Sequence, residues 1–232
     1  YLSAGSDYTS GTLNTSWAAS TNANRVVAVY SDSSDSYKLK AAVGTISSTS
    51  VSFGTPVVVD AGNTQWWNNS VFDSNSNKVV IAYRAHYDSG KLKAKVGTTD
   101  DTTMTFGDVE ETGDVGIPYA MVFDSNLNKV VIGYYDEGNS NYGTAIVGTV
   151  SSTDITFGTA QVFNSANTGY IGMSFDSDAN KVVTSYENVG NSEYPTVKVG
   201  TVSGTGIGFG DATVLKTSAS AWLAGAYDTN AD

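Results

Sequence analysis

Aromatic side chains recur along the chain at a spacing of about 52 residues, and they are the best candidates for binding a ligand. The aligned positions are Trp67, Pro118, Tyr170 and Trp222. The proline is followed by an aromatic residue, Tyr119, and Trp66 and Asn68 stand on either side of Trp67. An exposed indole or phenol ring next to an amide is typical of sugar-binding surfaces, because the ring stacks on a pyranose while the amide binds hydroxyl groups. The sequence therefore predicts a ligand-binding surface made by Trp66, Trp67, Asn68, Tyr119, Tyr170 and Trp222. The alternative is that these rings pack between neighbouring units of the fold.

Four loops carry polar and charged residues that could take part in catalysis. Residues 32–37, 136–142 and 187–194 end in tyrosine, and the equivalent residues 84–90 contain His86, the single histidine. These loops either add hydrogen-bonding groups to the aromatic surface or are solvated turns.

An enzyme acting on glycosidic bonds would need paired carboxyl groups in apolar surroundings. The sequence indicates no such pair and no raised pKa among the candidate acids, which are Glu110, Glu111, Glu187 and Glu193. The Asp-box motif of sialidases is also absent, and Arg25 and Arg84 are the only arginines. We therefore expect a protein that is not an enzyme.

Three turns resemble the start of a calcium-binding loop. Each begins with an aspartate and continues with alternating oxygen-bearing residues, at Asp73, Asp124 and Asp176. The glycine at the sixth position and the glutamate at the twelfth position of such a loop are missing. Aspartate side chains that cap their own turns explain the pattern equally well. No cofactor is predicted, and calcium at these three aspartates is kept as the alternative.

The composition excludes several classes of function. The 232 residues carry a formal net charge of −11, which repels a phosphate backbone, so we expect no nucleic-acid partner. The absence of cysteine and the single histidine exclude thiolate chemistry and disfavour a Ser-His-Asp triad or a histidine-rich metal site. No stretch approaches the roughly 18 apolar residues of a membrane helix, so we expect no membrane insertion. The first residues show no signal-peptide pattern, so we expect that such a peptide is absent or removed.

Three short motifs repeat in step along the chain. The first valine of an Asn-Lys-Val-Val or Asn-Arg-Val-Val motif stands at Val26, Val79, Val130 and Val182. Val-Gly-Thr begins at Val43, Val96, Val147 and Val199, and Phe-Gly begins at Phe53, Phe106, Phe157 and Phe209. All three motifs have the same spacing of about 52 residues, which indicates a repeated structural unit.

Each repeat predicts four antiparallel strands. Short apolar stretches of period two alternate with turn sequences rich in Asp, Asn, Ser and Gly, and no segment has a helical pattern. A sheet of four such strands has two apolar faces that only its neighbours can bury. The predicted fold is therefore all-β, a β-propeller of four-stranded blades of about 52 residues. A β-solenoid has shorter repeats, and a β-sandwich requires no such repetition.

We expect one domain over residues 1–232, with four full repeats and partial strands at both ends. The expected ranges are a partial outer strand 1–12, repeats 13–64, 65–116, 117–168 and 169–220, and the first strand of a fifth repeat 221–232. Three explanations of the partial repeat stay open. The chain is a segment of a longer propeller, or a small ring joined at its ends by strand exchange. The third explanation is self-association, in which partial blades of two or more chains close a ring.

The repeat sequence resembles repeats of uncharacterised phage tail proteins and bacterial surface proteins, many from marine sequence. The residues that carry the resemblance are 123–131, 147–151 and 156–158 and their equivalents over residues 13–232. The resemblance implies a role at a virion or cell surface, outside the cell. With the aromatic residues, it leads to the prediction of a non-catalytic recognition or adhesion module that binds surface glycans. The alternatives are a structural spacer of a tail fibre or surface protein and, ranked last, a glycoside hydrolase-like propeller.

Overall fold

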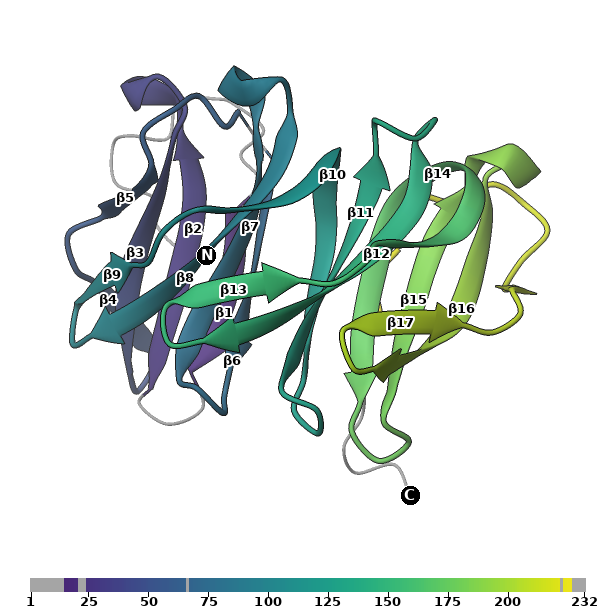
Figure 1. Cartoon of the computed structure of the whole chain (residues 1–232). Helices are drawn as coiled ribbons and strands as arrows, with labels where there is room; N and C mark the ends of the chain where they lie inside the picture. Colours follow the sequence, from purple (N-terminus) through teal and green to yellow (C-terminus); the bar gives the residue numbers. More distant parts are fainter. Residues whose placement is uncertain (1–14, 21–23, 66, 222, 227–232) are drawn as a thin grey trace.

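The computed structural model describes residues 15–20, 24–65, 67–221 and 223–226, and in these the chain is an all-β protein (Figure 1). Strands account for 66% of the structure, and the only helical segments described are three short 3-10 turns. The prediction of an all-β fold is confirmed. The described strands form one sheet of five and one of thirteen strands, and not one closed ring. No helix in the described part of the chain has the length and apolar character needed to cross a membrane.

The strands follow the four repeats of the sequence. Repeat 1 contains β1 (Thr15–Ser20), β2 (Arg25–Asp32), η1 (Ser33–Asp35), β3 (Lys38–Ser47), β4 (Ser50–Phe53) and β5 (Val57–Asp60). Repeat 2 contains β6 (Asn68–Asp73), β7 (Lys78–Ala85), η2 (His86–Asp88), β8 (Lys91–Asp100), β9 (Thr103–Phe106) and the start of β10 (Glu110–Asp124). Repeat 3 contains the rest of β10, β11 (Lys129–Asp136), β12 (Tyr142–Ser151), β13 (Asp154–Phe157) and the start of β14 (Gln161–Asp176). Repeat 4 contains the rest of β14, β15 (Lys181–Asn188), η3 (Val189–Asn191), β16 (Tyr194–Ser203), β17 (Gly206–Phe209) and β18 (Thr213–Val214).

Each repeat is an antiparallel unit of four strands, and the long strands β10 and β14, each shared by two repeats, join the units of repeats 2 to 4 into the thirteen-stranded sheet. The first strand pairs with the second and the second with the third, as β6, β7 and β8 do in repeat 2. The outermost strand consists of two segments that both pair with the third strand, as β13 and the start of β14 do with β12. The first strands of consecutive repeats contact one another, from β1 through β6 and β10 to β14. The four sheets therefore follow one another in chain order, as Figure 1 shows.

The apolar core lies between the repeats. Three clusters of buried residues fill the three junctions, and each contains residues from two consecutive repeats. The paired valines explain this arrangement, because successive residues of a strand point to opposite faces. Val79 belongs to the cluster shared with repeat 1, whereas Val80 belongs to the cluster shared with repeat 3. Both faces of an inner sheet are thus covered by its neighbours.

The Phe-Gly motif marks a close contact between backbones. A Cβ atom placed on Gly54, Gly107 or Gly158 would lie 1.8–2.0 Å from the carbonyl oxygen of a threonine in the next repeat. These threonines, Thr102, Thr153 and Thr205, stand in the turns before β9, β13 and β17. Only glycine allows this approach, which explains why the motif recurs in each repeat.

Candidate functional site

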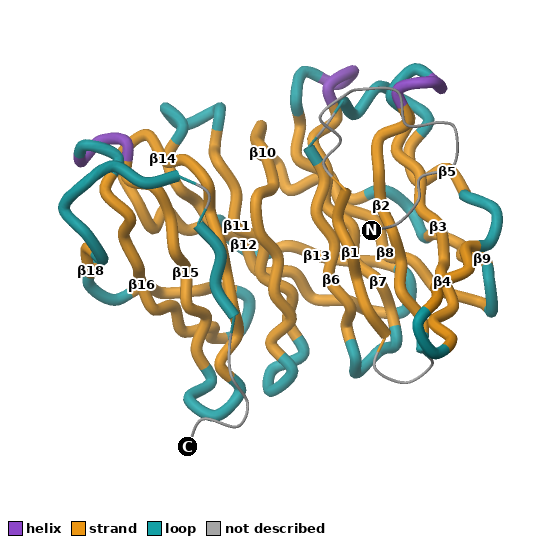
Figure 2. Tube along the Cα trace, turned by 180° about the vertical axis from the view of Figure 1, so that it is seen from behind, coloured by secondary structure: helices purple, strands orange, loops and turns teal. Residues whose placement is uncertain are grey.

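Three of the predicted aromatic residues, Trp67, Tyr119 and Tyr170, lie with the polar loops at one end of the strands. The turns η1, η2 and η3 lie at that end, the upper one in Figures 1 and 2. Trp67 precedes β6, and the N–H group of Arg84, near the end of β7, donates to its carbonyl oxygen at 3.0 Å. Gly169 of β14 pairs with Glu187 near the end of β15. We call the surface formed by Trp67, Arg84, Tyr119, Tyr135, Glu137, Tyr170 and Glu187 the rim.

Three aromatic rings of the rim form a row across repeats 2 to 4. The ring centroids of Trp67 and Tyr119 are 5.5 Å apart, and those of Tyr119 and Tyr170 are 6.3 Å apart in an edge-to-face arrangement. All three side chains are partly exposed. The rings thus pack on one another and still present surface to solvent. Trp66 and Trp222 lie outside the described residues.

Asn68 lies deeper than the aromatic row. Its side chain is buried, with 4% of its surface exposed, and its Oδ1 atom accepts a hydrogen bond from Ser16 Oγ at 3.0 Å. Ser16 Oγ also lies 2.9 Å from Ser70 Oγ. The predicted contact residue Asn68 therefore joins the inner strands β1 and β6.

Irregular backbone directs two of the aromatic side chains. The pairing of β10 with β11 shifts register between Pro118 and Ala120, and Tyr119 is the extra residue. The pairing of β14 with β15 shifts between Gly169 and Gly172, where Tyr170 has a φ of 42°. A left-handed φ is rare for an aromatic residue, and such bulges often re-aim side chains beside functional sites. Sequence periodicity does not reveal these bulges, because each adds one residue to an otherwise regular strand.

Glu187 is the most unusual charged residue of the rim. Its side chain is 8% exposed, and no hydrogen-bond or ion-pair partner of its carboxylate is found among the described residues. Burial raises the pKa of Glu187, and the negative charge of Glu193 adds to the rise. The expectation that no acid of these loops has a raised pKa is therefore wrong, because the carboxylate folds inward onto β14. A Cβ atom on Gly169 would lie 2.2 Å from Glu187 Oε2, so the glycine leaves the space that the carboxylate occupies.

A second carboxylate of the rim is held by an arginine. Arg84 Nε lies 2.7 Å from Glu137 Oε2, and its second nitrogen Nη2 lies 3.4 Å from Oε1. The forked guanidinium thus fixes the orientation of Glu137 from the neighbouring repeat. Arg84 Nη1 also lies 3.1 Å from His86 Nδ1. Among the described residues, His86 reaches this cluster through the arginine.

The pKa of Tyr119 is affected by burial and by the charges of the rim. Burial raises the pKa of Tyr119 to about 12, and the further causes are the charges of Tyr170, Tyr135, Glu187 and Glu137. Tyr119 lies in the middle of the aromatic row, between Trp67 and Tyr170. A sugar stacked on this row would have a buried carboxyl group and an arginine-bound carboxylate beside it.

One signal in the sequence identifies these residues. The residue five places after the first valine of each Val-Val pair is Ser31, Arg84, Tyr135 or Glu187. This position changes its chemistry completely, whereas the residue directly before it is tyrosine in all four repeats. In a repetitive scaffold, such variation marks the residues that the fold does not require.

The three calcium candidates cap their own turns. Asp124 Oδ1 accepts the N–H groups of Asn126 at 3.0 Å and Leu127 at 2.9 Å, and Asp73 and Asp176 accept equivalent pairs of N–H groups. Within the described residues, no three His, Asp or Glu side chains converge as a metal site would require. These aspartates act as Asx-turn caps in this structure.

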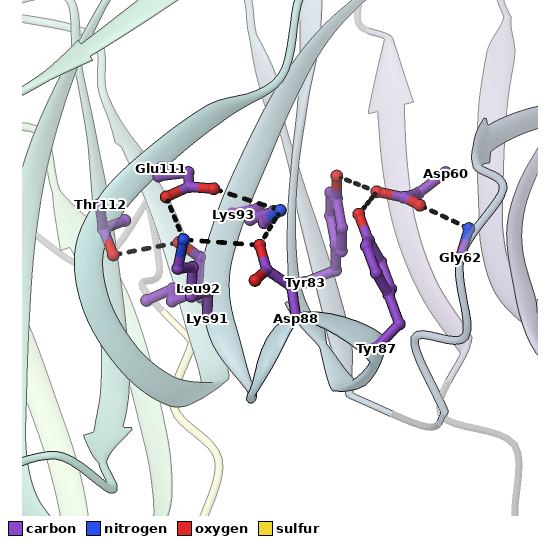
Figure 3. A network of polar contacts seen from close by, with 10 residues as sticks. All are labelled: Asp60, Gly62, Tyr83, Tyr87, Asp88, Lys91, Leu92, Lys93, Glu111 and Thr112. Carbon is purple, nitrogen blue, oxygen red and sulfur yellow. Dashed lines mark hydrogen bonds and ion pairs between the residues drawn. The ribbon is translucent and has the colours of Figure 1, made fainter.

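A polar network on the outer side of repeat 2 has a structural role (Figure 3). The hydroxyl groups of Tyr83 and Tyr87 donate to Asp60 Oδ2 at 2.6 and 2.9 Å, which ties repeat 2 to repeat 1. Beside them, Lys93 Nζ lies 2.6 Å from Asp88 Oδ2 and 3.2 Å from Glu111 Oε1. Every charge drawn there has a partner, so this network stabilises a junction and offers no free group to a ligand.

Comparison with known proteins shows similarity in fold only. No family model matches the chain, and no curated protein matches it in sequence. A glutamate-to-glutamine variant of an exo-β-1,3-galactanase from Phanerochaete chrysosporium, solved with β-1,3-galactotriose, matches over 90% of this chain and 51% of its own, with 10% identity and a TM-score of 0.57. The same galactanase with galactose matches over 88% of this chain and 50% of its own, with 9% identity and a TM-score of 0.55. A triple arginine-to-alanine mutant of AofleA from Arthrobotrys oligospora matches over 86% and 57%, with 10% identity and a TM-score of 0.54. The chain thus spans about half the length of these proteins.

These neighbours correct the functional prediction made from the sequence. Structures of a glycoside hydrolase with a propeller fold are among the most similar, so a hydrolase-like propeller was wrongly ranked last. The predictions of a non-catalytic recognition module and of a protein that is not an enzyme are overturned by the same finding. The misleading signal was the polar sequence around Glu187, which conceals that the side chain folds inward.

Proposed function

We propose that the four repeats are blades of a propeller whose rim hydrolyses glycosidic bonds. The observation that carries the proposal is Glu187, a buried carboxyl group with a raised pKa, next to the aromatic row and without a cationic partner among the described residues. A carboxyl group with a raised pKa holds its proton to a higher pH and can act as a general acid. The likeness in fold to a galactanase supports the same class of reaction.

The remaining rim residues supply the other roles in this proposal. Trp67, Tyr119 and Tyr170 stack on sugar rings. Glu187 gives its proton to the glycosidic oxygen while the bond between that oxygen and the anomeric carbon breaks. A water molecule adds to the anomeric carbon and gives a proton to Glu137, the second carboxylate, which Arg84 orients. The predicted setting, a virion or bacterial surface outside the cell, stays a prediction.

The test measures hydrolysis directly. The folded chain is incubated with β-1,3-linked galacto-oligosaccharides and with a panel of other glycans, and products are quantified by chromatography. We expect Glu187→Gln to lower the rate at least about 100-fold, whereas Asp211→Asn, at an exposed residue that is not part of the rim, leaves it within about twofold. Trp67→Ala is expected to raise KM through lost stacking. Absence of hydrolysis of every glycan by the folded wild-type chain, or full activity of Glu187→Gln, would refute the proposal.

A further inference from the structure

The two end repeats expose apolar surfaces that are buried in every other repeat. The valine of the Val-Gly-Thr motif is 1% exposed at Val43, 0% at Val96 and 0% at Val147, but 44% at Val199 of repeat 4. On the opposite face, Val51 of repeat 1 is 36% exposed, whereas its equivalents Met104, Ile155 and Ile207 are 3%, 1% and 5% exposed. Within the chain, each of these positions is buried against the neighbouring repeat. The outer face of repeat 4 therefore corresponds to the side of an inner junction that carries the Val-Gly-Thr valine. The outer face of repeat 1 corresponds to the opposite side of such a junction.

The close backbone contact is also left open at both ends. Gly54, Gly107 and Gly158 each receive the threonine turn of the next repeat, but the nearest atom to a Cβ on Gly210 is Val199 O at 3.8 Å. At the other end, Thr49 is the equivalent of the threonines in these turns, and it is exposed. Among the described residues, Gly210 thus has no threonine turn packed on it, and Thr49 has no Phe-Gly glycine beside it.

We propose that the outer faces of repeats 4 and 1 bind one additional blade with the chain's own repeat chemistry. Such a blade carries a threonine turn for Gly210 on one face and a Phe-Gly glycine for Thr49 on the other. It would bury Val199 and Val51 as the inner junctions bury Val147 and Ile207. The occupant is thus a sheet of this repeat type, whose first strand begins with the chain's own residues 223–226, and not a helix or an unrelated apolar ligand. This inference rests on the propeller proposed above and not on hydrolysis, so the two proposals fail separately.

The inner strand of such a blade has a place beside repeat 4. Residues 223–226 run along β14, where a Cβ atom on Gly172 would lie 2.9 Å from Leu223 O. In the repeat alignment, Asp232 is equivalent to Asn180, so Lys181 is equivalent to the next position. A copy of residues 181–220 fused after Asp232 would therefore continue the repeat in register.

Thiol labelling tests the proposal, because the chain contains no cysteine. Val199→Cys and Val51→Cys are prepared in the chain and in the fused form, with Val147→Cys as the buried control. We expect the first two variants to react rapidly in the chain and about tenfold or more slowly in the fused form. Val147→Cys should react slowly in both. Gly210→Val in the fused form should restore rapid labelling at position 199, since its side chain blocks the threonine turn.

A second fused protein guards against failure of the first fusion to fold. A copy of residues 117–168 is placed before Leu13 instead, and protection of Val51→Cys is measured. Unchanged labelling in both fused proteins would overturn the inference. Protection in the unfused chain that increases with protein concentration would also overturn it, because a second copy of the chain would then be the occupant.

Discussion

Gly158→Ala tests whether the repeats pack as closely as the structure indicates. The new Cβ atom would lie 1.8 Å from Thr205 O and 2.8 Å from its carbonyl carbon, both backbone atoms that cannot rotate away. The junction between repeats 3 and 4 must open by more than about 1 Å, at an overpacking cost of about 3 kcal/mol. Neither Gly158 nor Gly210 has a left-handed φ. Alanine at either position therefore lowers the entropy of the unfolded chain, which stabilises the folded protein by about 0.4–1 kcal/mol. The net loss is about 2 kcal/mol, or roughly 4–8 °C in Tm for a chain of this size.

Thermal unfolding followed by circular dichroism and calorimetry measures this loss. Gly210→Ala is the matched control, because its Cβ atom meets nothing closer than Val199 O at 3.8 Å and only the entropic gain remains. We expect Gly210→Ala to keep or slightly raise Tm. Equal Tm values for the two variants would refute the close contact between Gly158 and Thr205, and with it the packing of consecutive repeats.

Three further predictions concern pH, a junction and a turn. Because the pKa of Glu187 is raised above its ordinary value of 4.5, the stability that its proton gives is full below pH 4.5 and is lost as pH rises through the folded pKa. Glu187→Gln should therefore be more stable than wild type at pH 7, by about 1.4 kcal/mol per pKa unit of the rise, and a denaturant series from about pH 4 to 8 should show the gap closing in acid. Tyr83→Phe removes the hydrogen bond to Asp60 and should lower the free energy of unfolding in urea by about 1.5–3 kcal/mol. Tyr186→Phe should lower it little, because the Tyr186 hydroxyl has no hydrogen bond among the described residues. Equal losses in the two variants would contradict the role of the Tyr83 hydrogen bond. Asp124→Ala leaves two N–H groups without their acceptor and should cost about 1–2 kcal/mol with or without EDTA; a wild-type Tm that falls on adding EDTA would instead indicate calcium.

The repeat pattern predicts most of the fold. Period-two apolar stretches and regular turns are local signals, so the strands and their hairpin order follow from the residues. The pattern does not predict the division of the outer strand into two segments, as in β4 and β5, which occurs both with a proline after the Phe-Gly motif, in repeat 1, and without one. What the pattern cannot supply is the contact of Gly54 with Thr102, because this contact joins different repeats. The sequence shows the glycine as part of a motif, but only the structure shows which threonine it contacts.

The rim is harder to predict, because its chemistry depends on where single side chains point. Glu187 stands among polar residues in the sequence, yet it turns inward over Gly169, where burial raises its pKa. Tyr119 and Tyr170 reach the same place through one-residue bulges that no periodicity records. The sequence predicts the aromatic row in part, since Trp67, Tyr119 and Tyr170 do approach one another, but it does not predict the charges beside the row.

A scaffold of near-identical repeats separates the residues needed for folding from those free to do chemistry. Val79, Gly97 and Phe106 of repeat 2 have identical equivalents in the other three repeats. Their packing explains this, because Val79 and Phe106 pack in the cluster shared with repeat 1 and Gly97 leaves space for the Phe106 ring. Arg84 and Glu187 occupy one equivalent position and have opposite charges, so no shared packing requirement selects them. Glu187→Gln, which removes the charge and keeps the shape of the side chain, should then leave Tm at pH 7 unchanged or raised while it lowers the rate of hydrolysis at least about 100-fold. A large fall in Tm would mean that the rim charges hold the repeats together, and the variation at this position would lose its functional meaning.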